Sequence, residues 1–273
     1  MKISISTIGC TKWDFDRIVR EYAALGVEGI EVRGILDDME PDKMDIFFDA
    51  NASRTKKFLR DNNLEFSMFG TSVNFHDSAT FDTNIIAGKT AIDVCDKMGI
   101  PGIRVFGDKI ADESKQADVL DAVCRGLKML CGYASDTGKN VCVCLETHGD
   151  FNKIELFEAI ICEMQSYPNF GILWDIGAAF PLYGRDFMPF YKVIRPYIRH
   201  THIKDFIQNA DGSHKQCFVG DGVVPVKEMI GALLKDGYEG YFSLEWEKRW
   251  NPSLEEPEVV FPLYVKFMRA MEG

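Results

Sequence analysis

The stretch Val141-Cys142-Val143-Cys144-Leu145-Glu146 is a short apolar run that ends in a carboxylate. Runs of this length and composition, rich in small and β-branched residues, are typical of buried β-strands. Three later segments have the same pattern and end in Asp, His and Glu in turn: Gly171-Ile172-Leu173-Trp174-Asp175, Ile198-Arg199-His200-Thr201-His202 and Tyr241-Phe242-Ser243-Leu244-Glu245. The sequence therefore predicts four buried strands, each with a polar side chain at its C-terminal end.

Short strand-like segments alternate with amphipathic helices eight times along the 273 residues. Before the four segments above, strands are predicted at Lys2–Ile8, Gly29–Arg33, Glu65–Phe69 and Ile103–Phe106. Helices are predicted at Phe15–Leu25, Ala52–Asn62, Ile85–Met98, Gln116–Asp136, Ile154–Gln165, Phe187–Tyr197, Val226–Lys235 and Pro257–Met271. Glycine follows several of these helices, as a left-handed C-cap requires: Gly26, Gly99, Gly138 and Gly237.

Strands that alternate with helices of this length form parallel βαβ units, and eight units close into a (β/α)8 TIM barrel. We expect one such α/β barrel domain to occupy residues 1–273. The alternative is a doubly wound open sheet, which would carry a Gly-rich phosphate loop after the first strand. The segment Thr7-Ile8-Gly9-Cys10-Thr11 lacks the GxGxxG spacing of that loop, so the barrel is favoured.

The composition narrows the classes of function. The chain has 31 basic and 42 acidic residues, a net charge of −11, and no Lys/Arg block, which argues against nucleic acid as a partner. No apolar stretch of about 18 residues predicts a membrane span, and no apolar core of a secretion signal precedes Lys12. The eight cysteines show no CxxC spacing, and Cys142 and Cys144 lie inside a predicted strand, which indicates reduced thiols. We expect a cytoplasmic protein.

The four polar residues at the strand ends are candidate metal ligands. Each residue taken alone is better explained as a helix cap, a salt-bridge partner or a hydrogen-bonded core residue. Their equivalent places at the ends of four consecutive strands favour a metal site, because carboxylates buried together need a cation. Three carboxylates and one imidazole suit Mn²⁺, Mg²⁺, Co²⁺ or Zn²⁺ better than they suit a thiolate metal. The predicted ligands of one divalent ion are Glu146, Asp175, His202 and Glu245.

At these residues the chain resembles the xylose-isomerase-like barrel superfamily, which contains sugar phosphate isomerases and epimerases and apurinic-site endonucleases. The resemblance is carried by Leu145-Glu146-Thr147-His148, Leu173-Trp174-Asp175-Ile176-Gly177, His200-Thr201-His202-Ile203-Lys204-Asp205, Val219-Gly220-Asp221-Gly222 and Ser243-Leu244-Glu245-Trp246. It implies that the four residues bind one divalent metal, most often Mn²⁺. It also implies that Glu146 and Glu245 are catalytic and move the substrate proton, as the two ligand glutamates do in ketose epimerases of this family.

One departure from the family pattern restricts the reaction. Family members commonly carry a histidine two or three residues after the aspartate of strand six, where this chain has Gly177 and Ala178. Its absence argues against an ordinary monosaccharide epimerase and against a multinuclear zinc site. Together with the charge of −11, it also argues against a nuclease.

The predicted chemistry begins with a metal that polarises a sugar carbonyl and acidifies the adjacent C–H bond. A carboxylate or imidazole then removes the proton to give a metal-held enediolate, which is reprotonated to an isomer or epimer or loses a β-substituent. His148 is the candidate catalytic base for elimination, and orientation of a metal ligand is its alternative role. The candidate substrate-binding residues are Lys204, Arg104, His76 and Phe180. For Lys204, a salt bridge to a neighbouring carboxylate is an equally good interpretation.

The small residues Ala178 and Ala179 leave room beside Phe180, Tyr183 and Phe187. This resembles the C-glycoside deglycosylases, whose larger subunit is a barrel of this superfamily and is paired with a small β-sandwich subunit. The resemblance implies cleavage of a 3-keto-glycoside by elimination in an oligomer, whereas core packing or a subunit contact explains the aromatic residues equally well. Three functions stay open: a sugar isomerase or epimerase, a keto-glycoside lyase, and a non-enzymatic sugar-binding barrel.

Overall fold

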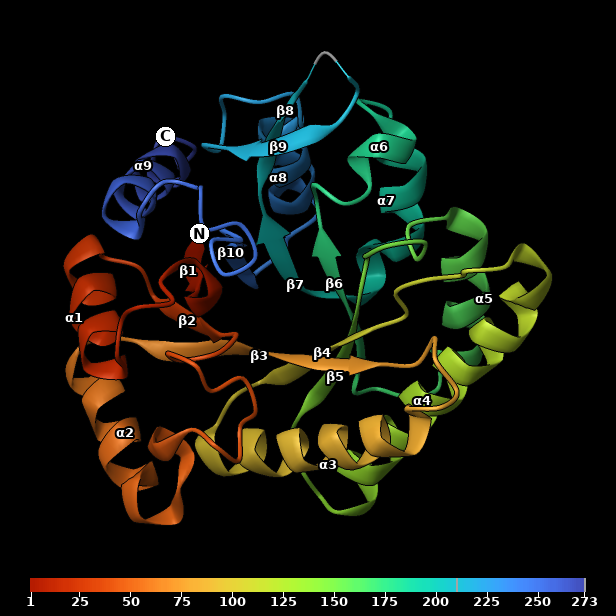
Figure 1. Ribbon diagram of the computed structural model, residues 1–273, viewed down its shortest axis with the longest axis horizontal. Coiled ribbons are helices and arrows are strands. Elements are labelled where there is room, and N and C mark those ends of the chain that lie inside the picture. Colours follow the sequence, from red (N-terminus) through yellow and green to blue (C-terminus); the bar gives the residue numbers. More distant parts are fainter. Residues whose placement is uncertain (210, 273) are drawn as a thin grey trace. The chain divides into compact units, whose positions relative to one another are not determined.

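The computed structural model describes residues 1–209 and 211–272. Within them, eight strands form a closed parallel barrel in the order β1-β10-β7-β6-β5-β4-β3-β2, and helices lie between successive strands along the chain (Figure 1). The barrel strands are β1 (Lys2–Ser6), β2 (Gly29–Val32), β3 (Glu65–Asn74), β4 (Gly102–Phe106), β5 (Cys142–Glu146), β6 (Phe170–Asp175), β7 (Ile198–Ile203) and β10 (Tyr241–Leu244). The predicted (β/α)8 fold is confirmed.

The chain divides into two compact units, of which the first contains Met1–Ser67 and His200–Gly273. In this unit β1 pairs with β2 and β10, and β10 pairs with β7. Its helices are α1 (Phe15–Leu25), α2 (Asp49–Asp61), α8 (Val226–Lys235) and α9 (Pro257–Arg269). Helices α1 and α9 lie side by side (Figure 1), where the Phe261 ring meets Tyr22 edge to face and Arg17 pairs with Glu258 at 2.6 Å.

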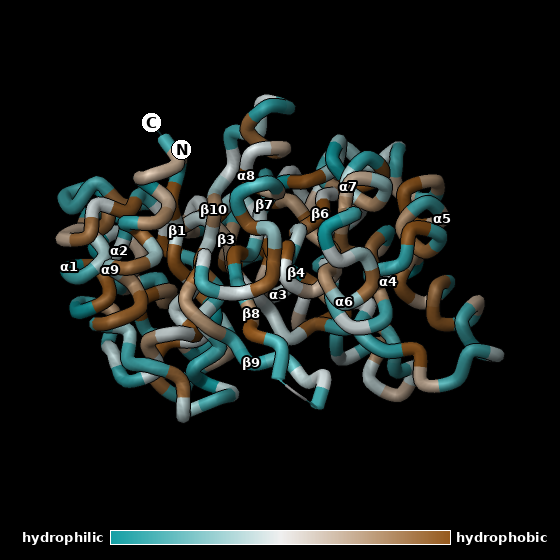
Figure 2. Tube along the Cα trace, turned by 90° about the horizontal axis from the view of Figure 1, so that it is seen from above, coloured by the Kyte–Doolittle hydropathy of each residue, from teal (hydrophilic) through white to brown (hydrophobic). Residues whose placement is uncertain are grey.

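The second unit contains Met68–Arg199. Here β3 pairs with β4, β4 with β5 and β5 with β6. Its helices are α3 (Phe81–Met98), α4 (Gln116–Asp136), α5 (Ile154–Met164), α6 (Phe180–Tyr183) and α7 (Met188–Ile194). Hydrophobic and hydrophilic residues alternate along the helices (Figure 2), and the apolar face of α5 buries Leu156, Phe157, Ile160 and Met164. This is the pattern of helices that pack one face against a sheet.

The glycines predicted after helices all have a positive φ, as a left-handed helix end requires, with 71° at Gly26 and 76° at Gly99. Several element boundaries differ from prediction, including the following three. Strand β3 continues to Asn74 through Gly70 and Thr71, helix α3 begins at Phe81, and the predicted helix Phe187–Tyr197 is α7 followed by a 3-10 turn containing Pro196. Proline lacks the N–H that an α-helix interior needs, which accounts for the last change.

A hairpin after β7 is not predicted from the sequence. Strand β8 (Asp205–Gln208) pairs antiparallel with β9 (His214–Cys217) in the first unit. Polar residues on both strands conceal the strand pattern, because among the residues of β8 and β9 only Asp205 and Gln216 are buried. A prediction from hydrophobicity alone therefore assigns this segment to a loop.

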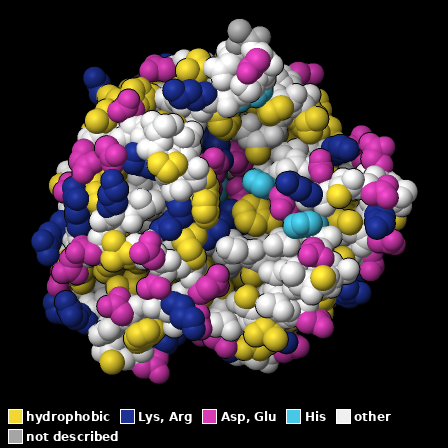
Figure 3. All heavy atoms as spheres, in the orientation of Figure 1, with side chains coloured by type: hydrophobic (Ala, Val, Ile, Leu, Met, Phe, Trp, Pro, Cys, Tyr) yellow, Lys and Arg dark blue, Asp and Glu magenta, His cyan; other side chains and the backbone are white. Residues whose placement is uncertain are grey.

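Basic and acidic side chains are intermixed on the face that Figure 3 shows. All eight cysteines are free. Among the described residues, no helix combines the length and the hydrophobicity needed to cross a lipid bilayer.

Candidate metal centre

In the first unit, Glu31 on β2 connects two histidines of β7. The Nε2 atoms of His200 and His202 lie 2.7 Å and 3.0 Å from the two carboxylate oxygens of Glu31. All three side chains are buried, and they offer ligand atoms within 4.8 Å of one another. Because a carboxylate accepts and does not donate, each histidine donates an Nε2–H to Glu31. Both nitrogens are used in hydrogen bonds to Glu31, so in this structure the trio links β2 to β7 and supports the ring of His202.

The carboxylate of Glu31 is held in its ionised form. Burial by itself raises the pKa of Glu31, but the charges and hydrogen bonds of His202 and His200 outweigh burial and hold that pKa well below its usual range. The other ring nitrogen of His202, Nδ1, lies 3.3 Å from Glu245 Oε2. The ring of His202 thus presents Nε2–H to Glu31 and Nδ1 to Glu245, which is the arrangement that a metal-binding histidine needs.

Glu245 immediately follows β10, and its backbone N–H donates to Ile203 of β7 at 3.2 Å. Its side chain pairs with Lys204, and the Lys204 ammonium also lies 2.8 Å from Glu247 Oε1. Lys204 and Glu245 are both buried, whereas Glu247 is partly exposed. The structure therefore places Lys204 in the ion pair that the sequence left open as an alternative to substrate binding.

Asp205 organises the loop between β7 and α8. Its buried carboxylate accepts four backbone hydrogen bonds of 2.8–3.0 Å, from the N–H groups of Phe206, Gly220, Gly222 and Val224. A Cβ at position 222 would stand 2.2 Å from Asp205 Oδ1, so only glycine fits there. The Val219-Gly220-Asp221-Gly222 segment thus wraps a carboxylate.

Replacing Asp205 by alanine is expected to lower the free energy of unfolding by about 3–5 kcal/mol, because several hydrogen bonds to a buried charge are lost together. Asparagine keeps one acceptor oxygen, so Asp205→Asn should lose less than Asp205→Ala. Urea denaturation followed by circular dichroism measures both. Equal stability of Asp205→Ala and the parent protein would show that water replaces the carboxylate without cost.

In the second unit, Glu146 at the end of β5 pairs with Arg104 of β4, and both side chains are buried. The Arg104 guanidinium also donates to the carbonyl of Thr71 at 3.1 Å and lies over the Phe106 ring, 3.9 Å from its centroid. Arg104, predicted to bind substrate, is thereby placed against a predicted metal ligand. The two terminal nitrogens of its guanidinium are both used in hydrogen bonds, to Glu146 and to Thr71.

Asp175, at the end of β6, is tied to the end of β5 by Thr147. The Thr147 hydroxyl accepts from the backbone N–H of Asp175 at 2.9 Å, and the Thr147 N–H donates to Leu173 at 3.0 Å. Asp175 Oδ1 accepts from the N–H groups of Gly177 and Ala178 at 2.9 Å and 3.2 Å. Small residues after Asp175 allow this tight turn, which fixes the orientation of the carboxylate.

His148 lies two residues beyond the end of β5, in the loop that follows this strand. Its Nδ1 lies 3.2 Å from Asp108 Oδ1, and Nδ1 of His76 lies 3.8 Å from the other oxygen. Asp108 follows β4 and adopts a left-handed φ of 64°, a backbone conformation that is uncommon outside glycine and often marks functional sites. The structure therefore brings His76 and His148 together around an aspartate that no sequence motif indicated.

The aromatic residues after β6 mostly pack against the protein itself. Phe187 is buried against Trp174, with ring centroids 6.2 Å apart, and Tyr183 stacks on Phe190 at 5.2 Å. Phe180 begins α6 and is partly exposed. Of the residues proposed to face a planar substrate group, Phe187 is a core residue, and Tyr183 is held by its stacking.

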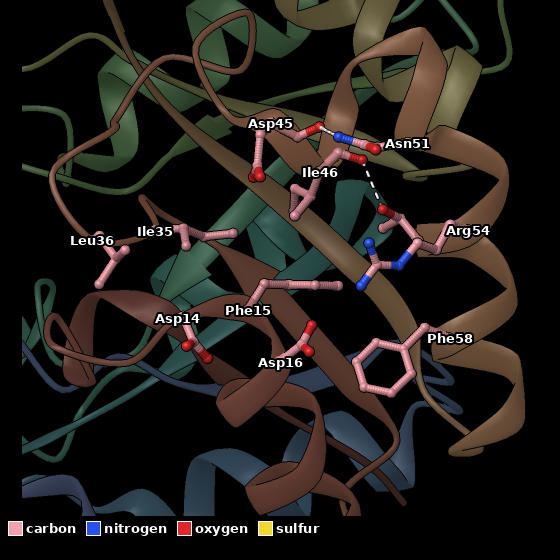
Figure 4. Close-up of a pocket in the computed structure, with 11 residues that line it drawn as sticks. Asp14, Phe15, Asp16, Ile35, Leu36, Asp45, Ile46, Asn51, Arg54 and Phe58 are labelled. Atoms are coloured by element: carbon pink, nitrogen blue, oxygen red, sulfur yellow. Dashed lines mark hydrogen bonds between the residues drawn. The ribbon is translucent and has the colours of Figure 1, made fainter.

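The first unit contains a hollow of about 260 Å³ (Figure 4). It is lined by the start of α1, by Ile35 and Leu36 after β2, and by α2. Two hydrogen bonds hold the segment before α2 to this helix: Asn51 donates to the carbonyl of Asp45 at 2.9 Å (Figure 4), and Thr55 donates to the carbonyl of Ile46 at 2.8 Å. None of the predicted metal ligands lines this pocket.

The fold and the buried acids and histidines at its strand ends define a TIM-barrel protein with a candidate metal centre. The family model described as "Xylose isomerase-like TIM barrel" matches residues 19–270, and the chain belongs to this family. The resemblance inferred from the sequence motifs is confirmed. A comparison with curated protein sequences finds no significant match.

Several solved structures share the fold over nearly the whole chain. The probable 3-DHS dehydratase of Bacillus anthracis involved in petrobactin synthesis has a TM-score of 0.77 at 19% identity, covering 98% of this chain and 99% of that one. The 3-keto-D-glucoside 4-epimerase of E. coli has a TM-score of 0.74 at 16% identity, covering 100% and 99%. A xylose isomerase-like barrel protein of Mycobacterium smegmatis in complex with magnesium has a TM-score of 0.72 at 15% identity, covering 99% and 96%.

Proposed function

We propose that the protein is a divalent-metal-dependent carbohydrate enzyme that moves a proton next to a sugar carbonyl, as a sugar isomerase or epimerase. The observation that carries the proposal is the set Glu146, Asp175, His202 and Glu245. All four are buried at or just beyond strand ends and carry atoms that a divalent ion accepts, which supports our proposal that they bind one ion. Family membership supports this function, and so does the fold shared with a 3-keto-D-glucoside epimerase.

The residues fit a hard divalent ion. Three carboxylates and one imidazole are donors that Mn²⁺, Mg²⁺, Co²⁺ and Zn²⁺ accept, and Mn²⁺ is our proposed native ion. The surroundings of His202 support this fit, because Glu31 binds Nε2 and fixes the ring with Nδ1 toward Glu245. Bound in this group, the ion would polarise a substrate carbonyl and acidify the neighbouring C–H bond.

The protein's own groups then carry the proton. In our proposal Glu245 and Glu146 exchange it with the substrate carbon, one carboxylate removing it and the other returning it. Lys204 holds Glu245 in place and Arg104 holds Glu146, so each carboxylate is oriented by a buried cation. Such fixed orientation is what proton transfer to carbon requires. The proposed partner is a small sugar or glycoside. The predicted cytoplasmic location, the oligomer and the β-sandwich subunit stay predictions.

A substrate panel tests the proposal directly. Ketohexoses and 3-keto-glucosides are incubated with the protein and Mn²⁺ in D₂O, and products are followed by NMR. We expect an isomer or epimer that has gained deuterium at one carbon, loss of this activity after chelation, and recovery when Mn²⁺ is added. Turnover that persists after the metal has been removed would contradict the proposed role of the ion.

A second candidate function is β-elimination from a 3-keto-glycoside. The observation that favours it is His148, whose side chain is 44% exposed and lies beside Asp108, so it is accessible as an additional base. The same panel separates the two reactions. Release of a phenol from a phenyl 3-keto-glucoside, without epimer formation, would support elimination and contradict the epimerase.

A further inference from the structure

The hairpin β8–β9 reaches the strand end that carries Glu245 through one side chain, Gln216. The Gln216 Nε2 donates to the carbonyl of Glu245 at 2.6 Å, and Gln216 Oε1 accepts from the N–H of Glu247 at 3.0 Å. A backbone carbonyl only accepts and a backbone N–H only donates, so the orientation of the Gln216 amide is determined by its partners. The amide therefore pairs with the backbone on both sides of Trp246, as a neighbouring strand would.

This contact occurs where the barrel strand has ended. Strand β10 stops at Leu244, and the Glu245 N–H still pairs with β7, but the segment then leaves the sheet. The side chain of Gln216 is buried, on the hairpin face opposite the exposed Lys215. Buried backbone groups need hydrogen-bond partners, and Gln216 supplies one at Glu245 and one at Glu247.

The backbone that Gln216 holds carries the charged groups of the proposed site. Glu245 and Glu247 both contact the ammonium group of Lys204, which directly precedes the hairpin. Asp205 anchors the base of the same hairpin through its hydrogen bonds to residues 220–224. A shift of the hairpin would therefore be transmitted to the backbone of Glu245 through Gln216, and to Lys204 through the chain.

We propose that Gln216 is a positioning residue that fixes the Glu245 carboxylate for metal binding and proton transfer. The inference rests on the proposed function, because it assigns Gln216 a part in that same site. The hairpin then also has a role, because Gln216 of β9 supports the backbone at the end of β10. This support acts through the backbone, so its loss changes the direction of the Glu245 side chain without removing any ligand.

Gln216→Met tests this proposal, because methionine has a similar volume and length and forms neither hydrogen bond. The matched control is Ser213→Ala, which removes bonds of Ser213 to Asp211 and Asn209 at the outer end of the hairpin. For Gln216→Met we expect an affinity for Mn²⁺ about tenfold weaker, as outer-shell substitutions produce. We also expect faster hydrogen exchange at the Glu247 amide and a kcat about 10–100-fold lower at a similar KM. Ser213→Ala should change none of these.

The outcomes separate the two proposals. If Gln216→Met retains parental Mn²⁺ affinity and Glu247 exchange, Gln216 is not a positioning residue, even where thermal stability falls. If the parent protein binds no Mn²⁺, the proposed function fails, and Gln216 is then judged by Glu247 exchange. Should Gln216→Met fail to fold, Gln216→Asn, which is shorter by one methylene and cannot span both partners, provides the same comparison.

Discussion

Replacing Glu146 by glutamine is expected to lower turnover by about 10³-fold or more, because a proposed proton carrier and a proposed metal ligand are lost together. The substitution keeps the size and shape of the side chain, so the loss reflects chemistry and not packing. Isothermal titration with Mn²⁺ and deuterium incorporation into a 3-keto-glucoside measure the two functions separately. Undiminished Mn²⁺ affinity and turnover would remove Glu146 from the proposed site.

The same substitution also affects stability, because it leaves the buried guanidinium of Arg104 without its carboxylate. Removing one partner of a buried pair costs about 3–5 kcal/mol. The double variant Arg104→Met/Glu146→Gln removes both charges, so we expect it to recover much of the lost stability while turnover stays absent. Recovery of turnover in the double variant would show that the single variant fails only because it unfolds. The free energies of unfolding of the two variants are compared after chelation, so that bound metal does not contribute to stability.

The strand ends were predictable because each carries a local signal. A single polar residue at a strand end has several explanations, but equivalent places at the ends of four consecutive strands favour a shared site, and Glu146 and Asp175 lie where their runs end. The pairing of Lys204 with a nearby carboxylate also followed from position, as one of two alternatives. These inferences needed only the pattern of apolar runs and the order of the segments along the chain.

Other parts of the site depend on contacts between distant segments. Glu31 meets His200 across 169 positions of sequence, and no local pattern reveals that partner. One signal did exist: Glu31 is a charged residue between Ile30 and Val32 in a predicted strand, and a buried acid needs a compensating group. That signal indicates a partner without identifying it.

The sequence signals for Asp108 and Gln216 are weaker than the signal for Glu31. The left-handed backbone at Asp108 depends on the neighbouring loop, where the N–H of Asp150 donates to the Asp108 carbonyl and leaves no space for a Cβ at Gly149. The role of Gln216 depends on the register of a polar hairpin that hydrophobic periodicity cannot detect. Side-chain to backbone contacts of this kind follow from the tertiary fold and are absent from the residue pattern.

Glu31→Gln is expected to weaken Mn²⁺ binding by about 10–100-fold, although Glu31 is not among the proposed ligands. Glutamine keeps the size of the side chain but removes the negative charge that both histidines face. Its amide nitrogen cannot accept a hydrogen bond, so it can accept from only one of the two Nε2–H groups. His202 then competes with His200 for that one oxygen, so its ring is held less firmly with Nδ1 toward Glu245. Titration of free Mn²⁺ by electron paramagnetic resonance measures the affinity without a substrate.

His200→Gln is the matched control for Glu31→Gln, since His200 shares the same carboxylate but is not a proposed ligand. A glutamine amide at position 200 can still donate to Glu31, so the charge and the hydrogen bond to His202 are retained. If Glu31 acts by orienting His202, Mn²⁺ affinity falls in Glu31→Gln and stays within about threefold of the parent in His200→Gln, below the usual outer-shell effect. Equal losses in both variants would mean that the buried trio supports the barrel as a whole, and that His202 needs no orienting partner to bind the ion.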